Sequence, residues 1–301
     1  MAPPARDASG QARATAVGAG AIGLWSSLAL LTTATAGVPP FELLALSFAV
    51  AFAASLALLA LRGRAAVAKL RQPWAPWGLA FAGLFLYHAL YFAALKMAPP
   101  AAAGLVAYLW PLLIVLFSAA LPGGRLRTQH VVGAALGLAG TALLLGGGSG
   151  GEQGSAPVLG FALALGCAVV WSGYSVLNRR FADVPSEMIG GVCGAVALAG
   201  LLCHIAFERG VVPGAGQWAA IVLLGLGPVG LAFFAWDHAT KRGNLPVLGT
   251  LSYAAPVLST GLLILAGRAA VSASLVAAAV LVVLGAVVAS YQPSRAISRA
   301  K

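Results

Sequence analysis

Charged residues are scarce in this sequence, and acidic residues are the scarcest. Only 8% of the 301 residues are charged, with seven Asp or Glu against eighteen Lys or Arg, whereas 60% are hydrophobic. Soluble domains carry about 25% charged residues, so this composition excludes a water-soluble globular protein. The seven acids lie in loops or near the ends of apolar runs, and no nucleophile or pair of acids is placed for catalysis. We therefore expect a membrane protein that is not an enzyme.

Cysteine is also rare. Cys167, Cys193 and Cys203 each lie inside an apolar run without the paired spacing of a metal site, so they are expected to be small buried side chains. No metal and no other cofactor is predicted. The net charge of +11 comes from basic residues in short loops between apolar runs, so no nucleic-acid partner is expected. The expected partners are the lipid bilayer and a small molecule, and the chain is expected to act as a monomer.

Long apolar runs are what the sequence has in abundance. Each is close to the ~20 residues that an α-helix needs to cross the hydrocarbon core of a bilayer. They predict ten transmembrane helices, over residues 14–36, 39–61, 74–97, 104–118, 129–145, 157–178, 183–207, 217–240, 245–266 and 272–291. The expected fold class is an all-α membrane protein.

Polar and glycine-rich segments divide the chain. Residues 1–13 are expected to be a disordered cytoplasmic tail, and residues 292–301 a second cytoplasmic tail. Two halves of five helices, residues 14–147 and 157–291, are joined by the glycine-rich segment 148–156, which is typical of a flexible linker and is expected in the periplasm.

The distribution of basic residues predicts the orientation. With both termini in the cytoplasm, fifteen of the eighteen Lys and Arg residues lie on the cytoplasmic side, and only Lys96, Arg209 and Arg268 lie outside. This asymmetry follows the positive-inside rule, and the opposite orientation would invert it.

The two halves repeat one another at an offset of 145 residues, as from Tyr108 to Tyr253. The same offset relates further pairs: Gly104 and Gly249, Pro111 and Pro256, Leu113 and Leu258, Lys96 and Lys241, and Gly140 and Gly285. Because each half holds an odd number of helices, the second half must enter the membrane from the opposite face. The sequence therefore predicts an inverted repeat.

A proline interrupts the corresponding helix of each half, at Pro111 and Pro256. Proline has no N–H and clashes with the preceding turn, so it breaks or bends a helix. Matching broken helices in inverted repeats border the substrate site of many transporters, near the bilayer midplane. The alternative is that both prolines only bend packed helices.

Aromatic residues with polar edges lie inside the apolar runs. The candidate substrate-binding residues are Tyr87, His88, Tyr91, Tyr108, Trp110, Trp171, Tyr174 and Tyr253. Tyr87 and Tyr91 share a helix face, as do Trp171 and Tyr174 with Ser175 and Asn178. Such rings inside a bundle suit a flat, partly polar substrate. The alternative for any single ring is the interfacial aromatic belt, which suits Trp74, Trp77 and Trp218 at helix starts.

Three segments carry a family resemblance: AYLWPLLIVLFS at 107–118, VVWSGYSVLNRRFA at 169–182 and GLAFFAWDHATKRGNLPVLGTLSYAAPVLSTGL at 230–262. They resemble the drug/metabolite transporter superfamily of the EamA type, and within it the aromatic amino acid exporters. The resemblance covers essentially the whole chain. It implies a secondary transporter of the bacterial inner membrane with ten helices in an inverted repeat. It also implies export of aromatic and other apolar amino acids, and of flat cations such as paraquat, by alternating access through a central cavity.

Two other transport functions stay open from the residues alone. A carrier of nucleotide-sugars or another small metabolite would want basic side chains in mid-membrane, and none is predicted there. A channel-like pore would want a ring of charge or a repeated filter motif, and neither is present.

The scarcity of acids also bears on energy coupling. No Asp or Glu lies at the centre of an apolar run, and the family's glycine-glutamate ends of helices 4 and 9 read Leu-Pro-Gly at 121–123 and Ala-Gly-Arg at 266–268. Asp237 is expected to pair with Lys241 near the cytoplasmic surface. His88 is open to two interpretations, as a proton carrier or as a hydrogen-bonding wall residue. We therefore expect a facilitative transporter.

Overall fold

The protein is described here by a computed structural model that covers residues 8–97, 103, 106–119, 121, 126–146, 158–267, 271 and 273–290. Throughout this part of the chain the secondary structure is helical. In chain order the elements are α1 (Ala8–Ser26), α2 (Leu28–Thr33), α3 (Pro40–Leu61), α4 (Arg64–Ala68), α5 (Trp74–Phe81), η1 (Ala82–Leu86), α6 (Tyr87–Met97), α8 (Trp110–Ser118), α9 (Thr128–Gly146), α10 (Val158–Leu177), η2 (Asn178–Phe181), α11 (Met188–Phe207), α12 (Ala215–Leu224), η3 (Gly225–Leu231), α13 (Ala232–Arg242), α14 (Leu245–Leu251), α15 (Ala254–Leu265) and α16 (Ala273–Ser290).

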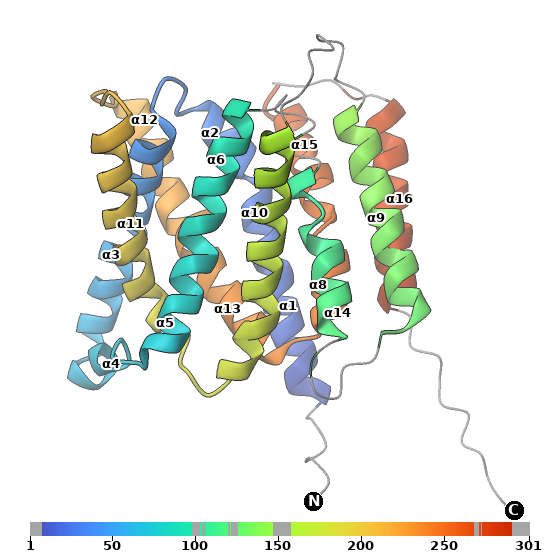
Figure 1. Cartoon of the computed structure of the whole chain (residues 1–301), viewed down its shortest axis with the longest axis horizontal. Helices are drawn as coiled ribbons and strands as arrows, with labels where there is room; N and C mark the ends of the chain where they lie inside the picture. The colour runs from blue at the N-terminus through green and yellow to red at the C-terminus, as the bar shows by residue number, and fades with distance from the viewer. Residues whose placement is uncertain are drawn as a thin grey trace, which may run out of the picture.

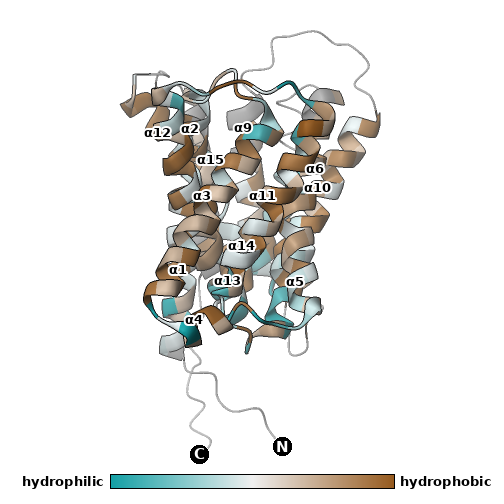
Figure 2. Ribbon diagram, turned by 90° about the vertical axis from the view of Figure 1, so that its left-hand side faces the viewer, coloured by the Kyte–Doolittle hydropathy of each residue, from teal (hydrophilic) through white to brown (hydrophobic). Residues whose placement is uncertain are grey.

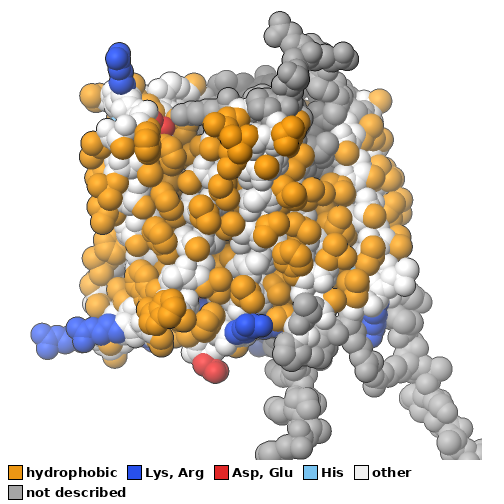
Figure 3. Space-filling model, in the orientation of Figure 1, with side chains coloured by type: hydrophobic (Ala, Val, Ile, Leu, Met, Phe, Trp, Pro, Cys, Tyr) orange, Lys and Arg blue, Asp and Glu red, His pale blue; other side chains and the backbone are white. Residues whose placement is uncertain are grey.

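Within the described residues, seven helical stretches are long and apolar enough to cross a membrane, by length and composition. They are Ser9–Thr33, Pro40–Leu61, Trp74–Ala94, Val158–Phe181, Met188–Phe207, Ala215–Arg242 and Leu245–Leu265, and Val276–Gly285 is a shorter apolar helix. The helices stand side by side with apolar flanks (Figures 1 and 2). Lys and Arg side chains gather at the end of the bundle where both termini lie, and hydrophobic side chains cover the flank (Figure 3). The chain is a multi-span membrane protein.

Two predicted boundaries are wrong. Helix α1 begins at Ala8, inside the segment 1–13 that we expected to be a disordered tail, because Ala, Gln and Arg are good helix formers. Helix α11 begins at Met188 rather than in the segment 183–187, whose residues form turns before it. The predicted linker 148–156 and the tail 292–301 lie outside the described residues.

The two proline-bearing stretches are interrupted just before each proline. A turn at Tyr108 and Leu109 precedes α8, and a turn at Ser252 and Tyr253 separates α14 from α15. Pro111 and Pro256 lie in the first turns of α8 and α15. A missing N–H has no effect in a first turn, so each proline favours a helix start there.

Two π-helical segments, η1 and η3, are features that the sequence analysis did not foresee. They lie in helices related by the 145-residue offset, and each has a carbonyl that accepts a hydrogen bond from a ring nitrogen. His88 Nδ1 lies 2.6 Å from the Leu84 carbonyl oxygen, and Trp25 Nε1 lies 2.9 Å from the Pro228 carbonyl oxygen. Widened turns of this kind occur frequently at functional sites.

The helices of the two halves pack against each other in pairs. Helix α3 packs against α11, α9 against α16, α1 against α13, α6 against α10 and α8 against α14. Each pair joins an element before residue 147 to one after residue 157. Helices α3 and α11 approach closely at small residues: a Cβ on Gly190 would clash with Ser55, and a Cβ on Gly194 would lie 2.9 Å from the ring of Phe52.

Three ionisable residues join α3 to the end of α11. The Glu208 carboxylate accepts the backbone N–H groups of Phe41 and Glu42 at 3.0 and 3.1 Å, and His204 Nδ1 lies 3.0 Å from the same carboxylate. The first N–H groups of a helix have no partner within it, so this carboxylate satisfies donors that would otherwise stay unpaired.

Candidate substrate site

Aromatic rings from six helical elements meet at the centre of the bundle. Neighbouring rings have centroids 5.1 to 6.4 Å apart, which is the spacing of interacting aromatic pairs. The aromatic cluster consists of Trp25, Phe48, Tyr87, His88, Tyr91, Phe92, Trp110, Trp171, Tyr174, Phe233 and Trp236.

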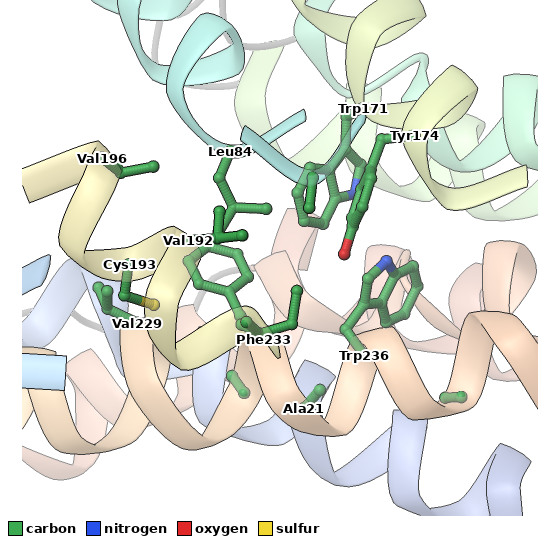
Figure 4. Close-up of a cluster of buried hydrophobic side chains, with 14 of the residues drawn as sticks. Ala21, Leu84, Trp171, Tyr174, Val192, Cys193, Val196, Val229, Phe233 and Trp236 are labelled. Carbon is green, nitrogen blue, oxygen red and sulfur yellow. The ribbon is translucent and has the colours of Figure 1, made fainter. Parts of the chain in front are cut away.

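Trp171 is the common member of this cluster. Its ring lies 5.6 Å from Trp25 of α1, 6.3 Å from Trp110 of α8 and 6.2 Å from Trp236 of α13, with the first two edge-on and the last stacked. Figure 4 shows Trp171, Tyr174 and Trp236 grouped together, with Phe233 beside them. Four tryptophans from four helices, two in each half, thus form one continuous aromatic surface.

The rings of the cluster differ in how deeply they are buried. Trp236 is fully buried and Trp171 and Trp110 nearly so, whereas Trp25, Tyr87, His88 and Tyr91 are half-buried. The α6 rings face the bundle, because Tyr87 contacts Trp171 and His88 contacts Phe48 and Phe233. The α6 rings therefore border the fully buried part of the cluster.

Three phenol groups gather above this surface. Tyr108, in the turn before α8, lies near Tyr87 and Tyr91, and the Cys167 thiol lies 3.5 Å from the Tyr87 carbonyl oxygen. Phenols supply hydrogen-bond donors and acceptors beside the aromatic faces.

His88 has a defined hydrogen-bonding role. A carbonyl oxygen only accepts, so Nδ1 must carry the hydrogen in the contact with Leu84. In the neutral ring Nε2 is then an acceptor, and the ring packs among Phe48, Phe92 and Phe233. His88 can therefore accept a hydrogen bond from an ammonium or indole N–H group.

Two of the predicted site residues, Tyr174 and Tyr253, are packed tightly against neighbouring helices. Tyr174 is almost fully buried and its ring lies against Gly83 of η1, where a Cβ would clash. Tyr253 lies away from the aromatic cluster, in a separate buried group with Val115, Ala134 and Val282. The 145-residue offset pairs Tyr253 with Tyr108, but the structure brings only Tyr108 to the cluster.

Five members of the cluster were not among the predicted site residues: Trp25, Phe48, Phe92, Phe233 and Trp236. Phe233 and Trp236 lie 145 residues after His88 and Tyr91, so the repeat could have identified them. Trp25 lies 146 residues before Trp171, which is nearly the same offset. Phe48 and Phe92 had no distinguishing signal, since each is a phenylalanine in an apolar run.

A buried polar group adjoins the cluster at α13. Asp237 pairs with Lys241 at 2.7 Å, as expected, and both side chains are completely buried inside the protein. Asn178 donates to the Asp237 carboxylate at 2.9 Å, and Lys241 donates to the Val184 carbonyl at 3.0 Å. A buried ion pair needs such additional hydrogen bonds to offset the cost of desolvation.

Comparison with known proteins identifies the family. The model of the EamA-like transporter family matches residues 14–146 and 158–291. The chain belongs to the EamA-like transporter family. Its membership accounts for the multi-span architecture and makes it a membrane transporter. In the part of the chain that the structure covers, no group of three His, Cys, Asp or Glu residues could hold a metal ion.

Two relatives of this chain within the family share the same name. The transporter is 57% identical over 279 residues to the aromatic amino acid exporter YddG of Ancylobacter novellus, which covers 92% of this chain and 96% of that protein. It is 26% identical over 192 residues to the aromatic amino acid exporter YddG of Salmonella typhimurium, covering 60% of this chain and 64% of that one. A crystal structure of a protein 56% identical in sequence matches with a TM-score of 0.88, over 93% of this chain and 97% of that chain.

Proposed function

We propose that this transporter exports aromatic and other apolar amino acids across the bacterial inner membrane, with the aromatic cluster as the wall of its binding site. The observation that carries the proposal is the continuous surface of Trp25, Trp110, Trp171 and Trp236 within the bundle. Aromatic faces stack with indole and phenyl side chains and also attract flat cations. The names of the relatives support the same substrate class.

The proposed architecture is ten transmembrane helices as two inverted repeats of five. Support comes from the helix pairs between halves, from the interruptions at residues 108–109 and 252–253, and from the π-helical segments η1 and η3. Features that recur at one offset in both halves are expected when one half is a copy of the other.

Both termini are proposed to be cytoplasmic. The basic side chains at the terminus-bearing end of the bundle support this orientation (Figure 3). The aromatic cluster is built from both halves of one chain, so the proposed transporting unit is a monomer.

Alternating access is the proposed mechanism, without obligatory coupling to protons. At the terminus-bearing end, α13 packs against η2. The repeat-related elements α2 and α6 lie at the opposite end, where α2 packs mainly against α12 and α15 (Figure 1). This difference between related ends supports a state that is closed towards the cytoplasm, and transport requires the converse state as well.

Counterflow in proteoliposomes tests the proposal. Vesicles loaded with unlabelled tryptophan should accumulate labelled tryptophan, phenylalanine and tyrosine from the medium, while empty vesicles should not. Exchange of a nucleotide-sugar instead of any aromatic amino acid would contradict the proposal. Flux that increases linearly with concentration, without saturation, would indicate a channel-like pore.

A further inference from the structure

The aromatic cluster leaves the charged end of an amino acid without an opposite charge. His88 is the one titratable side chain among its members besides the three tyrosines. A zwitterionic substrate carries an ammonium and a carboxylate, and both are strongly hydrated in water. The nearest side chains in sequence with the complementary charges are Asp237 and Lys241, which follow Trp236 on α13.

The partners that hold Asp237 and Lys241 have the chemistry of a zwitterion. Asn178 presents an N–H donor to Asp237, as an ammonium would, and Val184 presents a carbonyl acceptor to Lys241, as a carboxylate would. Both partners belong to η2 and the segment after it, whereas Asp237 and Lys241 share one helix. Separation of α13 from η2 would remove both partners and leave the ion pair itself intact.

Tyr174 provides a second observation at the same place. Its side chain is 2% exposed, and its hydroxyl makes no hydrogen bond of normal geometry in the described structure. The hydroxyl points towards Trp236 in Figure 4 and interacts electrostatically with Asp237. A buried hydroxyl that makes no well-formed hydrogen bond is costly, so a polar group that enters this region would gain a contact.

We infer that Asp237 and Lys241 recognise the zwitterionic head of the substrate when the cytoplasmic end opens. Asp237 binds the ammonium in place of the Asn178 amide, and Lys241 binds the carboxylate in place of the Val184 carbonyl. The substrate then stabilises the open arrangement by replacing both lost hydrogen bonds, while its ring lies on the aromatic cluster. Asp237 and Lys241 are thus specificity-determining residues that select amino acids over other flat amphiphiles. This inference rests on the proposed function.

Competition with matched indole compounds tests it. Inhibition of labelled tryptophan counterflow is measured for tryptophan, for tryptamine, which lacks the carboxylate, and for indole-3-propionate, which lacks the ammonium. In the wild type, each analogue should need a concentration roughly tenfold or more above that of tryptophan to give the same inhibition. This is the size of effect expected for a lost hydrogen bond to a charged group. Asp237→Asn should remove the advantage of tryptophan over indole-3-propionate, and Lys241→Gln its advantage over tryptamine.

Neutralising one member leaves the other charge buried, so the double variant D237N/K241Q keeps the test valid if a single variant fails to fold. In the double variant, all three compounds should inhibit the counterflow of labelled tryptophan equally well. Arg242→Gln is the matched control, because Arg242 also bridges α13 to the Ala182 carbonyl but its side chain is exposed. This control variant should keep the wild-type ranking.

Two results would overturn the inference. The first is that variants of Asp237 and Lys241 keep the wild-type ranking of the three compounds. The second is that they weaken inhibition by all three compounds by the same factor. Either result would mean that the pair only helps to close the bundle. A wild-type protein that transports no aromatic amino acid would contradict the proposed function instead, so the two failures are distinguishable.

Discussion

Gly140 and Gly285, 145 residues apart, each lie against the backbone of the helix that carries the other. A Cβ on Gly140 of α9 would lie 2.9 Å from the carbonyl oxygen of Ala278, and a Cβ on Gly285 of α16 would lie 2.5 Å from that of Gly133. The contact is reciprocal, as expected for equivalent positions of two repeated halves. Helices α9 and α16 can approach this closely because both positions lack a side chain.

Alanine at either glycine should therefore destabilise the protein. Overpacking of a tight contact costs about 1–3 kcal/mol, and Gly285→Ala should cost more than Gly140→Ala because its contact is shorter. Thermal unfolding of the detergent-solubilised protein measures the effect. Gly261→Ala is the control, since nothing lies within 4 Å of a Cβ there. Equal melting temperatures for all three variants would contradict the close approach.

Alanine substitution in the aromatic cluster should weaken transport. Loss of one interacting ring at Trp110, Trp171, Tyr87 or Tyr91 should raise the half-saturating concentration of tryptophan about three- to tenfold, because an aromatic contact contributes ~0.5–1.5 kcal/mol beyond its area. Tyr253→Phe is the control, because Tyr253 lies in the separate buried group beside α9. Normal transport by cluster variants that reach the membrane at wild-type levels would disprove the assignment.

The helix starts at Pro111 and Pro256 should affect the rate of alternating access. Each proline favours an interruption just before it, so Pro111→Ala or Pro256→Ala should allow a more continuous helix, slow transport and bias access towards one face of the membrane. Labelling of single cysteines placed on each side of the aromatic cluster measures that bias. Unchanged labelling from both faces, with unchanged flux, would reduce both prolines to ordinary bends.

Protons should not drive accumulation of substrate. The Asp237 carboxylate is paired with Lys241 and accepts a hydrogen bond from Asn178, so proton coupling through Asp237 would require this buried group to break apart. In proteoliposomes with equal tryptophan on both sides, an imposed pH gradient should produce no net accumulation. Uphill transport that His88→Ala or Asp237→Asn abolishes would show the opposite.

The ion pair between Lys69 and Glu187 should contribute a small, acid-sensitive part of stability. Partial burial acts to raise the pKa of Glu187, but the hydrogen bond from Lys69 at 2.6 Å outweighs it, and the net pKa is lowered. A lowered pKa contributes stability above the unfolded value, and that stability is lost as pH falls through the folded value. The side chains are 48% and 26% exposed, so Glu187→Gln should cost no more than about 1 kcal/mol at pH 7.

Unfolding measured across pH 3–8 checks this prediction. The wild type and Glu187→Gln should converge below about pH 4, near the usual pKa of a glutamic acid. A difference between them that stays constant down to pH 3 would mean that the pair does not contribute through its charge.

The sequence by itself determined that this chain is a helical membrane protein built from two similar halves. Hydropathy is a local property, and a bilayer accepts only segments whose own apolar length matches its thickness, so the spans can be found without knowing their neighbours. The aromatic residues Tyr87, Tyr91, Trp110 and Trp171 were identified for a related reason, since rings with polar edges are unusual deep inside such runs. The interruptions beside Pro111 and Pro256 follow from proline itself.

Only the tertiary structure decided which of these residues meet. Tyr108 and Tyr253 occupy equivalent positions in the two halves, yet Tyr108 lies near Tyr87 and Tyr91 of the aromatic cluster and Tyr253 packs beside Gly137 of α9. Asp237 was expected to pair with Lys241 near the cytoplasmic surface, and only the structure shows that both side chains of this pair are fully buried, because η2 covers that end of α13. Ring contacts and ion-pair burial depend on how each helix is rotated and crossed against the next one. Those angles are set by packing between distant segments, which no local sequence pattern records.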